Sequence, residues 1–201
     1  TTTITYDAEA PQSAVSVPAN GAIINAVPAI NGTASDLPGG NPGTVAQMNA
    51  RLKRLSDNWY WDGFGAWGAG VQDLGPGQGV GVGAGTWNIN GVNIPSGANL
   101  TSGVSYYLTT SGWDDAGGIG PNKEAWGSPS GSTFTFDNTA PRSGISNPTD
   151  GSFRNSVPAF AGVSNDNVLV STVQLSIQNA SIVAPNCYNP AINAFNAVCP
   201  A

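Results

Sequence analysis

Histidine is absent from this chain of 201 residues. Because imidazole is the side chain that most often moves protons near neutral pH, its absence excludes histidine-based acid–base catalysis and the Ser-His-Asp and Cys-His nucleophile systems. It also removes the commonest protein ligand of zinc and copper. An enzyme would have to work with carboxylates alone, and we expect this protein not to be one.

Charged residues are scarce as well. They make up 9% of the chain, against about 25% in an average soluble domain. Six Lys and Arg residues stand against twelve Asp and Glu residues, which gives a net charge of −6. So few basic side chains cannot neutralise a phosphate backbone, and we expect no nucleic-acid partner. No apolar run approaches the roughly 18 residues that a membrane helix requires, so we expect no membrane span.

Cysteine occurs only twice, at Cys187 and Cys199. We expect these two residues to form a disulfide, which would contribute about 3 kcal/mol in the chain-entropy model. The alternative is a pair of reduced thiols in a cytosolic protein. Low lysine content and abundant Thr, Ser, Asn and Gly suit an extracellular or cell-surface protein. The sequence begins at Thr1 rather than at Met, so we expect a processed product or part of a longer chain.

What the chain does contain is enough apolar material to fold, and an internal repeat. Hydrophobic residues make up 40% of the sequence and include six Trp. Residues 2–36 align without gaps onto residues 132–166, and 15 of these 35 positions are identical. Identical pairs include Asp7 with Asp137, Gly32 with Gly162 and Asp36 with Asp166. The offset of 130 throughout predicts a tandem array with a period of about 130 residues.

Alternation of apolar and polar residues predicts an all-β fold. The expected strands are Val45–Lys53, Thr86–Ile89, Val104–Thr110, Ser132–Phe136 and Val170–Ile177. The glycine-rich run 68–85 is expected to be an extended surface loop. Short strands separated by Pro, Gly and Asn indicate β-sandwiches.

The repeat also predicts domain boundaries. Residues 8–137 are expected to form one complete sandwich, and residues 138–201 the first half of a second one. Residues 1–7 are expected to be the last strand of a preceding or neighbouring repeat, because they align with the strand that ends at Asp137. If the polypeptide ended where the sequence does, Thr3, Ile4, Thr5 and Tyr6 would be a free strand. Such a strand could complete the unfinished domain of another copy and build a filament by strand complementation. The alternative is a piece of a longer repeat chain.

Several stretches resemble a known family. They are FTFDNTAP at 134–141, VPAFAGVSND at 157–166, the run that begins Trp59-Tyr-Trp-Asp-Gly, and the turn Gly112-Trp113-Asp114-Asp115-Ala116. With them the chain resembles the tandem bacterial Ig-like domains of large surface proteins and adhesins. The resemblance implies Ig-like β-sandwich repeats in an extracellular setting. It implies a role as stalk, filament, surface-layer material or adhesion module, and it specifies no ligand.

The densest aromatic cluster of the sequence suggests an alternative function, carbohydrate binding. Trp59, Trp61 and Trp67 could stack on sugar rings if they formed a flat row on a β-face, which would make the chain an adhesin or carbohydrate-binding module that recognises surface glycans. The competing interpretation is that these aromatics fill the core of the sandwich, because they are the largest packing groups available.

Two groups of charged residues are the remaining candidates for a functional or structural role. The carboxylates suggest calcium at a domain junction, with Asp7 or Asp137 at a strand end and Asp114 or Asp115 in a turn; solvated turn carboxylates are the alternative. We expect no other cofactor. A strand that carries Arg51, Lys53 and Arg54 is expected to be a charged sheet edge that blocks unwanted pairing. The alternative is contact with an acidic patch on a neighbouring copy, since the protein itself is the expected partner.

Overall fold

A computed structural model describes residues 1–4, 6–27, 29–36, 43–82, 84–89, 94–117, 120–127 and 131–199. The chain divides into two compact units, Thr1–Thr139 and Ala140–Ala201, which are called unit 1 and unit 2 below. Within the described ranges the structure is built of β-strands, with a single turn of 3-10 helix, η3 (Gly97–Asn99). It follows that the prediction of an all-β fold is confirmed. No helix in these ranges is long and apolar enough to cross a membrane.

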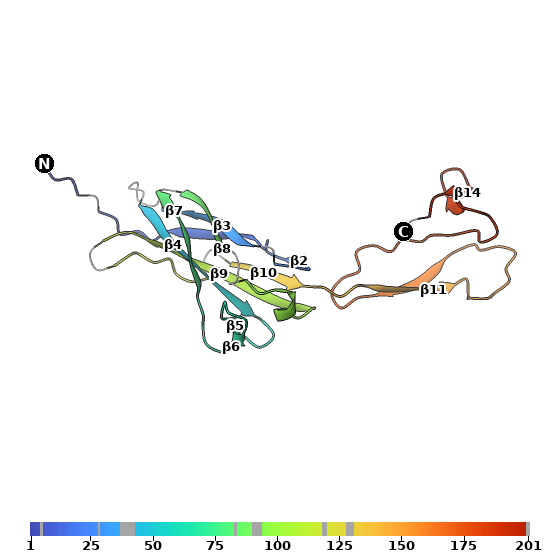
Figure 1. Cartoon of the computed structure of the whole chain (residues 1–201), viewed down its shortest axis with the longest axis horizontal. Helices are drawn as coiled ribbons and strands as arrows, with labels where there is room; N and C mark the ends of the chain where they lie inside the picture. The colour runs from blue at the N-terminus through green and yellow to red at the C-terminus, as the bar shows by residue number, and fades with distance from the viewer. Residues whose placement is uncertain are drawn as a thin grey trace. The chain divides into compact units, whose positions relative to one another are not determined.

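One of the two sheets of unit 1 has three antiparallel strands (Figure 1). Its strands are β1 (Gln12–Val17), β3 (Ile30–Ser35) and β8 (Ala84–Ile89), in the order β1-β3-β8. Gly32 of β3 lies close against β1 and Trp87, because a Cβ at this position would collide with the carbonyl oxygen of Ala14 and with the ring of Trp87. Only glycine fits between these two neighbours.

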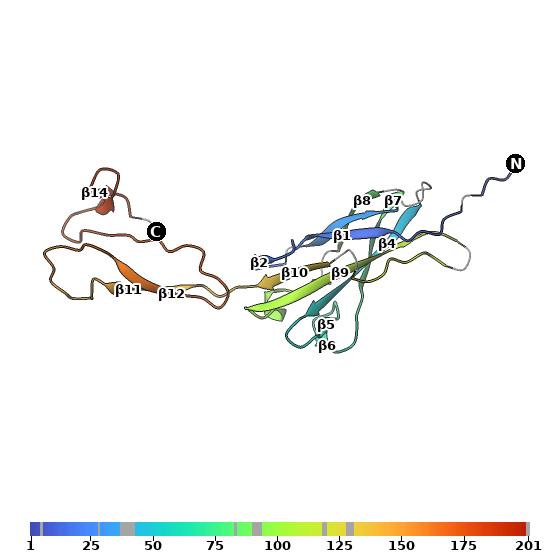
Figure 2. The same ribbon diagram turned by 180° about the vertical axis from the view of Figure 1, so that it is seen from behind.

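The second sheet of unit 1 has seven strands (Figure 1, Figure 2). They are β2 (Ala22–Ile24), β10 (Gly131–Phe136), β9 (Val104–Asp114), β4 (Thr44–Arg54), β5 (Tyr60–Trp61) and β6 (Trp67–Gly68) in this spatial order, with β7 (Leu74–Val82) also paired to β4. The pairing of β2 with β10 is parallel, and the other pairings are antiparallel.

Side chains from both sheets form one hydrophobic core. In β10 the alternation predicted from the sequence is visible directly: Ser132, Phe134 and Phe136 are buried, whereas the threonines between them are partly exposed. Trp87 belongs to the same core from the three-stranded sheet, and Leu108 joins it from β9. Burial of large apolar side chains of this kind stabilises a fold by about 1.5–3 kcal/mol each.

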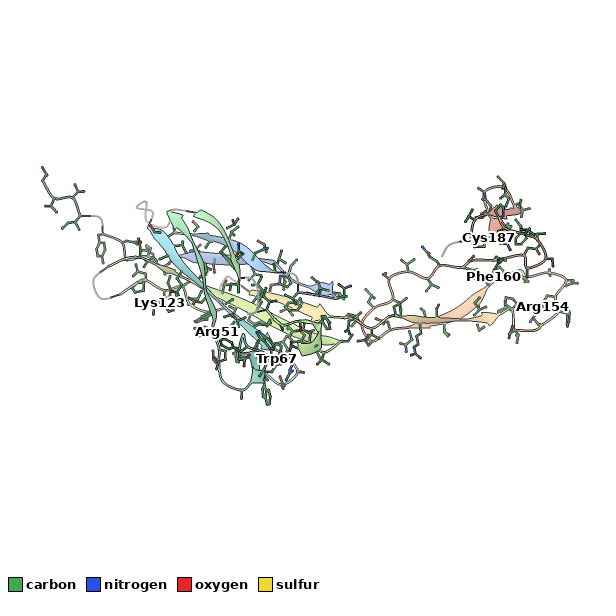
Figure 3. The ribbon with its side chains drawn as sticks, in the orientation of Figure 1. Arg51, Trp67, Lys123, Arg154, Phe160 and Cys187 are labelled. Carbon is green, nitrogen blue, oxygen red and sulfur yellow. A yellow bond between two sulfur atoms is a disulfide. The ribbon has the colours of Figure 1, made fainter. Side chains whose placement is uncertain are left out.

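Two expectations for unit 1 are wrong. The run 68–85 is not a surface loop, because β7 pairs along it with β4 and β8 begins at its end. The strand that carries Arg51, Lys53 and Arg54 is not a sheet edge, since β4 has neighbours on both sides. Its basic side chains are instead covered locally: Arg51 forms an ion pair with Asp73, and its guanidinium lies 3.7 Å from the ring centroid of Trp126. Figure 3 labels Arg51 on this sheet.

Unit 2 is built from two hairpins. The first consists of β11 (Arg142–Asn147) and β12 (Ala161–Asn165), and the second of β13 (Cys187–Asn189) and β14 (Ala194–Ala197). The Cys187–Cys199 disulfide is confirmed, with the two Cα atoms 5.1 Å apart; Cys187 is labelled in Figure 3. The predicted strand Val170–Ile177 is wrong, because the segment forms no strand and Val173 and Leu175 are exposed. Its contact with β13 is confined to its end, where the N–H of Tyr188 donates to the carbonyl of Ile177 (2.8 Å). Its alternation satisfies one requirement of a strand, but a strand also needs a hydrogen-bonded neighbour.

The first hairpins of the two units correspond residue by residue. Gln12 pairs with Ser35 in β1–β3, and Arg142 pairs with Asn165 in β11–β12, both at the offset of 130 seen in the sequence. Each register shifts at the same place, between positions 15 and 17 in one hairpin and between 145 and 147 in the other. Like Gly32, Gly162 lies against a backbone carbonyl of the facing strand, that of Gly144. The two aligned segments therefore fold into hairpins with the same register.

Candidate functional site

Three aspartates from distant parts of the sequence meet at one end of unit 1. Asp36 follows the last residue of β3, Asp114 is the last residue of β9, and Asp7 lies in the segment that leads into β1. The strand pairing explains why these three residues lie close together. Residue 12 pairs with residue 35, and residue 45 pairs with residue 114, so the start of β1, the end of β3, the start of β4 and the end of β9 fall at the same end of the two sheets.

The oxygens of these side chains are close enough to share one ion. One carboxylate oxygen from each residue lies within 4.8 Å of the corresponding oxygens of the other two. Asp36 and Asp114 are buried, and Asp7 is partly exposed. The side chain of Asp36 is only 1% exposed, and its Oδ2 atom is buried without a hydrogen-bond partner. Such an atom is unusual, because buried polar groups are nearly always hydrogen-bonded.

The other two carboxylates are held in place by hydrogen bonds. Asp114 Oδ1 accepts hydrogen bonds from the backbone N–H groups of Ala116 (3.1 Å) and Asn122 (2.7 Å), and Oδ2 accepts one from the side-chain amide of Asn122 (2.7 Å). Asp7 Oδ1 accepts a hydrogen bond from the backbone N–H of Glu9 (3.1 Å). Asp114 and Asp7 are therefore oriented by their own loops, and Asp36 is oriented by burial.

The electrostatic environment of Asp36 is unfavourable to its charge. Burial, which makes the largest contribution, and the neighbouring carboxylates of Asp7, Asp114 and Asp115 together raise the pKa of Asp36 from 3.8 to about 6. Neither of the ion pairs found in the described residues involves this cluster, because they join Arg51 to Asp73 and Arg54 to Asp57. A proton or a bound cation would relieve the repulsion.

Gly43, just before β4, lies against this cluster. A Cβ atom at Gly43 would collide with Oδ2 of Asp36 and with Oδ2 of Asp7. Both oxygens therefore face the same small space beside the backbone, and any side chain at position 43 would intrude on it. The donor set consists of oxygens alone, which suits a hard cation.

The sequence identified part of this cluster. Asp114 and Asp7 were both candidates for a calcium site, and the structure brings them together. Asp115 is exposed, as expected for a residue that points to the opposite face from Asp114. Asp137 is held elsewhere, because its Oδ1 accepts hydrogen bonds from the Ser102 hydroxyl (3.0 Å) and from the backbone N–H of Thr139 (3.1 Å).

Sequence reasoning did not single out Asp36, although a signal was present. Asp36 and Asp166 are an identical pair in the repeat, as are Asp7 and Asp137. A polar residue retained at the end of a strand in both copies points to a role for its side chain beyond simple solvation. Asp166 also has a buried oxygen, Oδ1, without a hydrogen-bond partner.

A second buried carboxylate, Glu124, was also missed. Its side chain accepts hydrogen bonds from the backbone N–H of Ser13 (2.9 Å), from the Ser13 hydroxyl (2.5 Å) and from the backbone N–H of Gly112 (2.9 Å). The Ser111 hydroxyl donates to the backbone carbonyl of Glu124 (2.8 Å). Glu124 thus joins the start of β1 in one sheet to the end of β9 in the other. Its hydrogen-bond donors are distant in sequence, so no local motif predicts these contacts.

The aromatic cluster does not form a flat row. Trp61 is 2% exposed, and its ring is tilted by 57° against that of Trp67 at a centroid distance of 5.4 Å. Trp67, labelled in Figure 3, also contacts Tyr106 in the core, and its indole N–H donates to the carbonyl of Asn99 (2.7 Å). Trp59 is exposed. Because Trp61 is buried, it presents no face on which a sugar could stack.

The N-terminal segment proposed as a donor strand forms no strand in the described residues. Ile4 and Tyr6 are 86% and 81% exposed. Thr3 is also exposed, and Thr5 lies outside the described residues. Figure 1 shows this end of the chain leading away from the sheets of unit 1.

These observations define the class of protein: an all-β chain with a disulfide in unit 2 and a carboxylate cluster in unit 1. Comparison of the chain with protein-family models, with curated proteins and with solved structures gave no match.

Proposed function

We propose that this protein is an extracellular structural protein, a stalk, filament or surface-layer component built from tandem Ig-like β-sandwich repeats. The observation that carries the proposal is the pair of hairpins β1–β3 and β11–β12, which share their register and their irregularity at an offset of 130 residues. A protein that repeats the same structural unit along its chain extends in one direction, as stalks and filaments do.

The apolar residues of unit 2 support a repeat that is completed by further strands. Ile30 is 1% exposed in unit 1, whereas its repeat equivalent Phe160 is 42% exposed in unit 2. Figure 3 labels Phe160, which precedes β12. In unit 1 the sheet of β4, β9 and β10 supplies the other side of the core, and unit 2 has no such sheet in its described residues. We infer that strands equivalent to these cover the hairpin in the working protein, either from the same polypeptide or by complementation from another copy.

The disulfide supports an extracellular location. Disulfides persist in oxidising environments and are rare in the reducing cytosol. Cys187 and Cys199 are the two cysteines of the chain, and both are used in this bond.

The aromatic cluster gives less support to the alternative, an adhesin or carbohydrate-binding module. Recognition by stacking needs aromatic faces open to solvent, and the face of Trp61 is covered in the core. The ring contacts among Trp61, Trp67 and Tyr106 account for this cluster as packing.

The proposal is tested by the denatured mass and the location of the native protein. We expect it on the cell surface, with a denatured mass several times 20.3 kDa, as a covalent array of repeats requires. A mass near 20.3 kDa in a protein that forms long polymers would replace the covalent array by strand complementation. A monomer of that mass inside the cell would contradict the proposal.

A further inference from the structure

We propose that Asp7, Asp36 and Asp114 form a calcium-binding site that fastens the N-terminal segment to both sheets of unit 1. The inference rests on the geometry of unit 1 and does not depend on the proposed structural function.

The spacing of the oxygens fits one shared calcium ion. Calcium binds oxygens at about 2.3–2.6 Å, so two oxygens on the same ion lie at most about 5 Å apart. The three carboxylate oxygens are within 4.8 Å of one another. Calcium takes roughly six to eight oxygen ligands, and backbone and water oxygens would complete this coordination shell.

Asp36 distinguishes this cluster from a group of solvated surface carboxylates. Its side chain is buried, its Oδ2 has no hydrogen-bond partner, and this atom faces Oδ2 of Asp7 across the space beside Gly43. A carboxylate oxygen buried in this way needs a hydrogen bond, a proton or a cation, and a cation would serve Asp7 and Asp114 at the same time. Nearby Lys123 does not provide one in the structure, because its Nζ lies 3.8 Å from the ring centroid of Trp113.

The donor chemistry selects calcium among the common metals. The chain has no histidine, and both cysteines are in the disulfide, so the nitrogen and sulfur ligands that zinc and copper prefer are not available. Magnesium requires a near-ideal octahedron with shorter bonds and keeps most of its water, whereas calcium tolerates an irregular set of carboxylates.

A bound ion would join three parts of unit 1. Asp36 directly follows β3 of the three-stranded sheet, and Asp114 is the last residue of β9 in the seven-stranded sheet. Asp7 belongs to the segment before β1. The ion would therefore hold the entering chain against both sheets, next to the point where Glu124 already joins β1 to β9.

Isothermal titration of CaCl2 into the full 201-residue chain, freed of metal with a chelator, tests the proposal. We expect binding in the micromolar to millimolar range. The Asp36→Asn variant should weaken it by at least about tenfold, because a ligand charge is lost. Asp115→Asn is the matched control, since it removes the same charge next to Asp114 from an exposed side chain, and it should change the affinity by no more than about threefold.

A second variant separates the geometry from the charge. Gly43→Ala removes no carboxylate, but its Cβ would displace the oxygens of Asp36 and Asp7, so it should also weaken calcium binding by at least about tenfold. Circular dichroism of each variant without calcium shows whether the fold is intact. The proposal is overturned by wild-type protein that binds no calcium at millimolar concentrations, by unchanged affinity in folded Asp36→Asn, or by tighter binding of magnesium than of calcium.

Discussion

The carboxylates of Asp36 and Asp114 approach each other across two different sheets, with an oxygen of one within 4.8 Å of an oxygen of the other. Like charges at this distance repel, and Asp36 Oδ2 has no donor to offset the repulsion. The end of unit 1 where the chain enters is therefore less stable than its core unless a cation neutralises it.

Calcium should stabilise unit 1 against heat. A ligand present at about 100 times its Kd adds about 2.7 kcal/mol to the free energy of unfolding. For a chain of this size that corresponds to a rise in Tm of several degrees. Differential scanning calorimetry with excess calcium and with excess chelator measures the difference. Asp36→Asn, with its affinity weakened at least about tenfold, should keep no more than about half of this calcium-dependent shift. Without calcium its Tm should be at or above that of the wild type, because the repulsion is relieved. An equal shift in both proteins would show that calcium acts elsewhere.

The stability of the metal-free protein should depend on pH through Asp36. Its pKa is about 6 in the folded chain and 3.8 ordinarily, so the folded state holds the proton more tightly than the unfolded state does. Its contribution to the free energy of unfolding is therefore largest below pH 3.8, falls as the pH rises through about 6, and stays low above that. The groups responsible besides burial are Asp7, Asp114 and Asp115.

Urea unfolding in chelator between pH 4 and pH 7 measures this contribution as the difference between wild type and Asp36→Asn. Carboxylates whose pKa is lowered in the folded state, such as Asp62 with its backbone hydrogen bonds, titrate in both proteins and cancel in the comparison. Parallel pH profiles for the two proteins would contradict the assignment of a raised pKa to Asp36.

Glu124→Gln should destabilise unit 1. The amide replaces one accepting oxygen by an N–H₂ group, which then faces a donor, either at Ser13 or at Gly112. Leaving such a buried group unsatisfied costs about 1–3 kcal/mol. Urea unfolding of this variant beside Asp150→Asn, an exposed control, gives the comparison. Equal stability of the two variants would mean that the Glu124 hydrogen bonds do not contribute to the junction of the two sheets.

Gly32→Ala should be strongly destabilising, whereas Gly68→Ala should not. A Cβ at Gly32 meets the Ala14 carbonyl and the ring of Trp87, and overpacking of this kind costs about 1–3 kcal/mol or more. A Cβ at Gly68 meets no atom within 4 Å, so the same substitution there is expected to be near neutral. Chemical denaturation of the two variants measures these losses, and equal losses would argue against the close approach of Gly32 to β1 and Trp87.

Alternation of apolar and polar residues correctly predicted a strand where a paired strand lies beside it and one face is buried. Phe134 and Phe136 alternate with threonine and do face the core. The same pattern failed for Val173 and Leu175, because alternation says which face is apolar and not whether a pairing strand exists. The glycines of β7 gave no apolar signal at all, and only the neighbouring β4 makes that segment a strand.

The candidate site shows the same limit. Asp7 and Asp114 could be named from their positions at a strand end and in a turn, since such features are local. Asp36 required knowledge that β3 ends beside β9, which is a property of the sheets. Likewise, the burial of Trp61 depends on contacts with distant rings. Residue type suggested the chemistry, and the tertiary pairing decided which residues share it.

Anomalous diffraction from crystals of the chain grown with calcium tests the central claim about this site most directly. The account predicts a calcium peak about 2.3–2.6 Å from oxygens of Asp7, Asp36 and Asp114. A map at saturating calcium with no peak between these three side chains would contradict it.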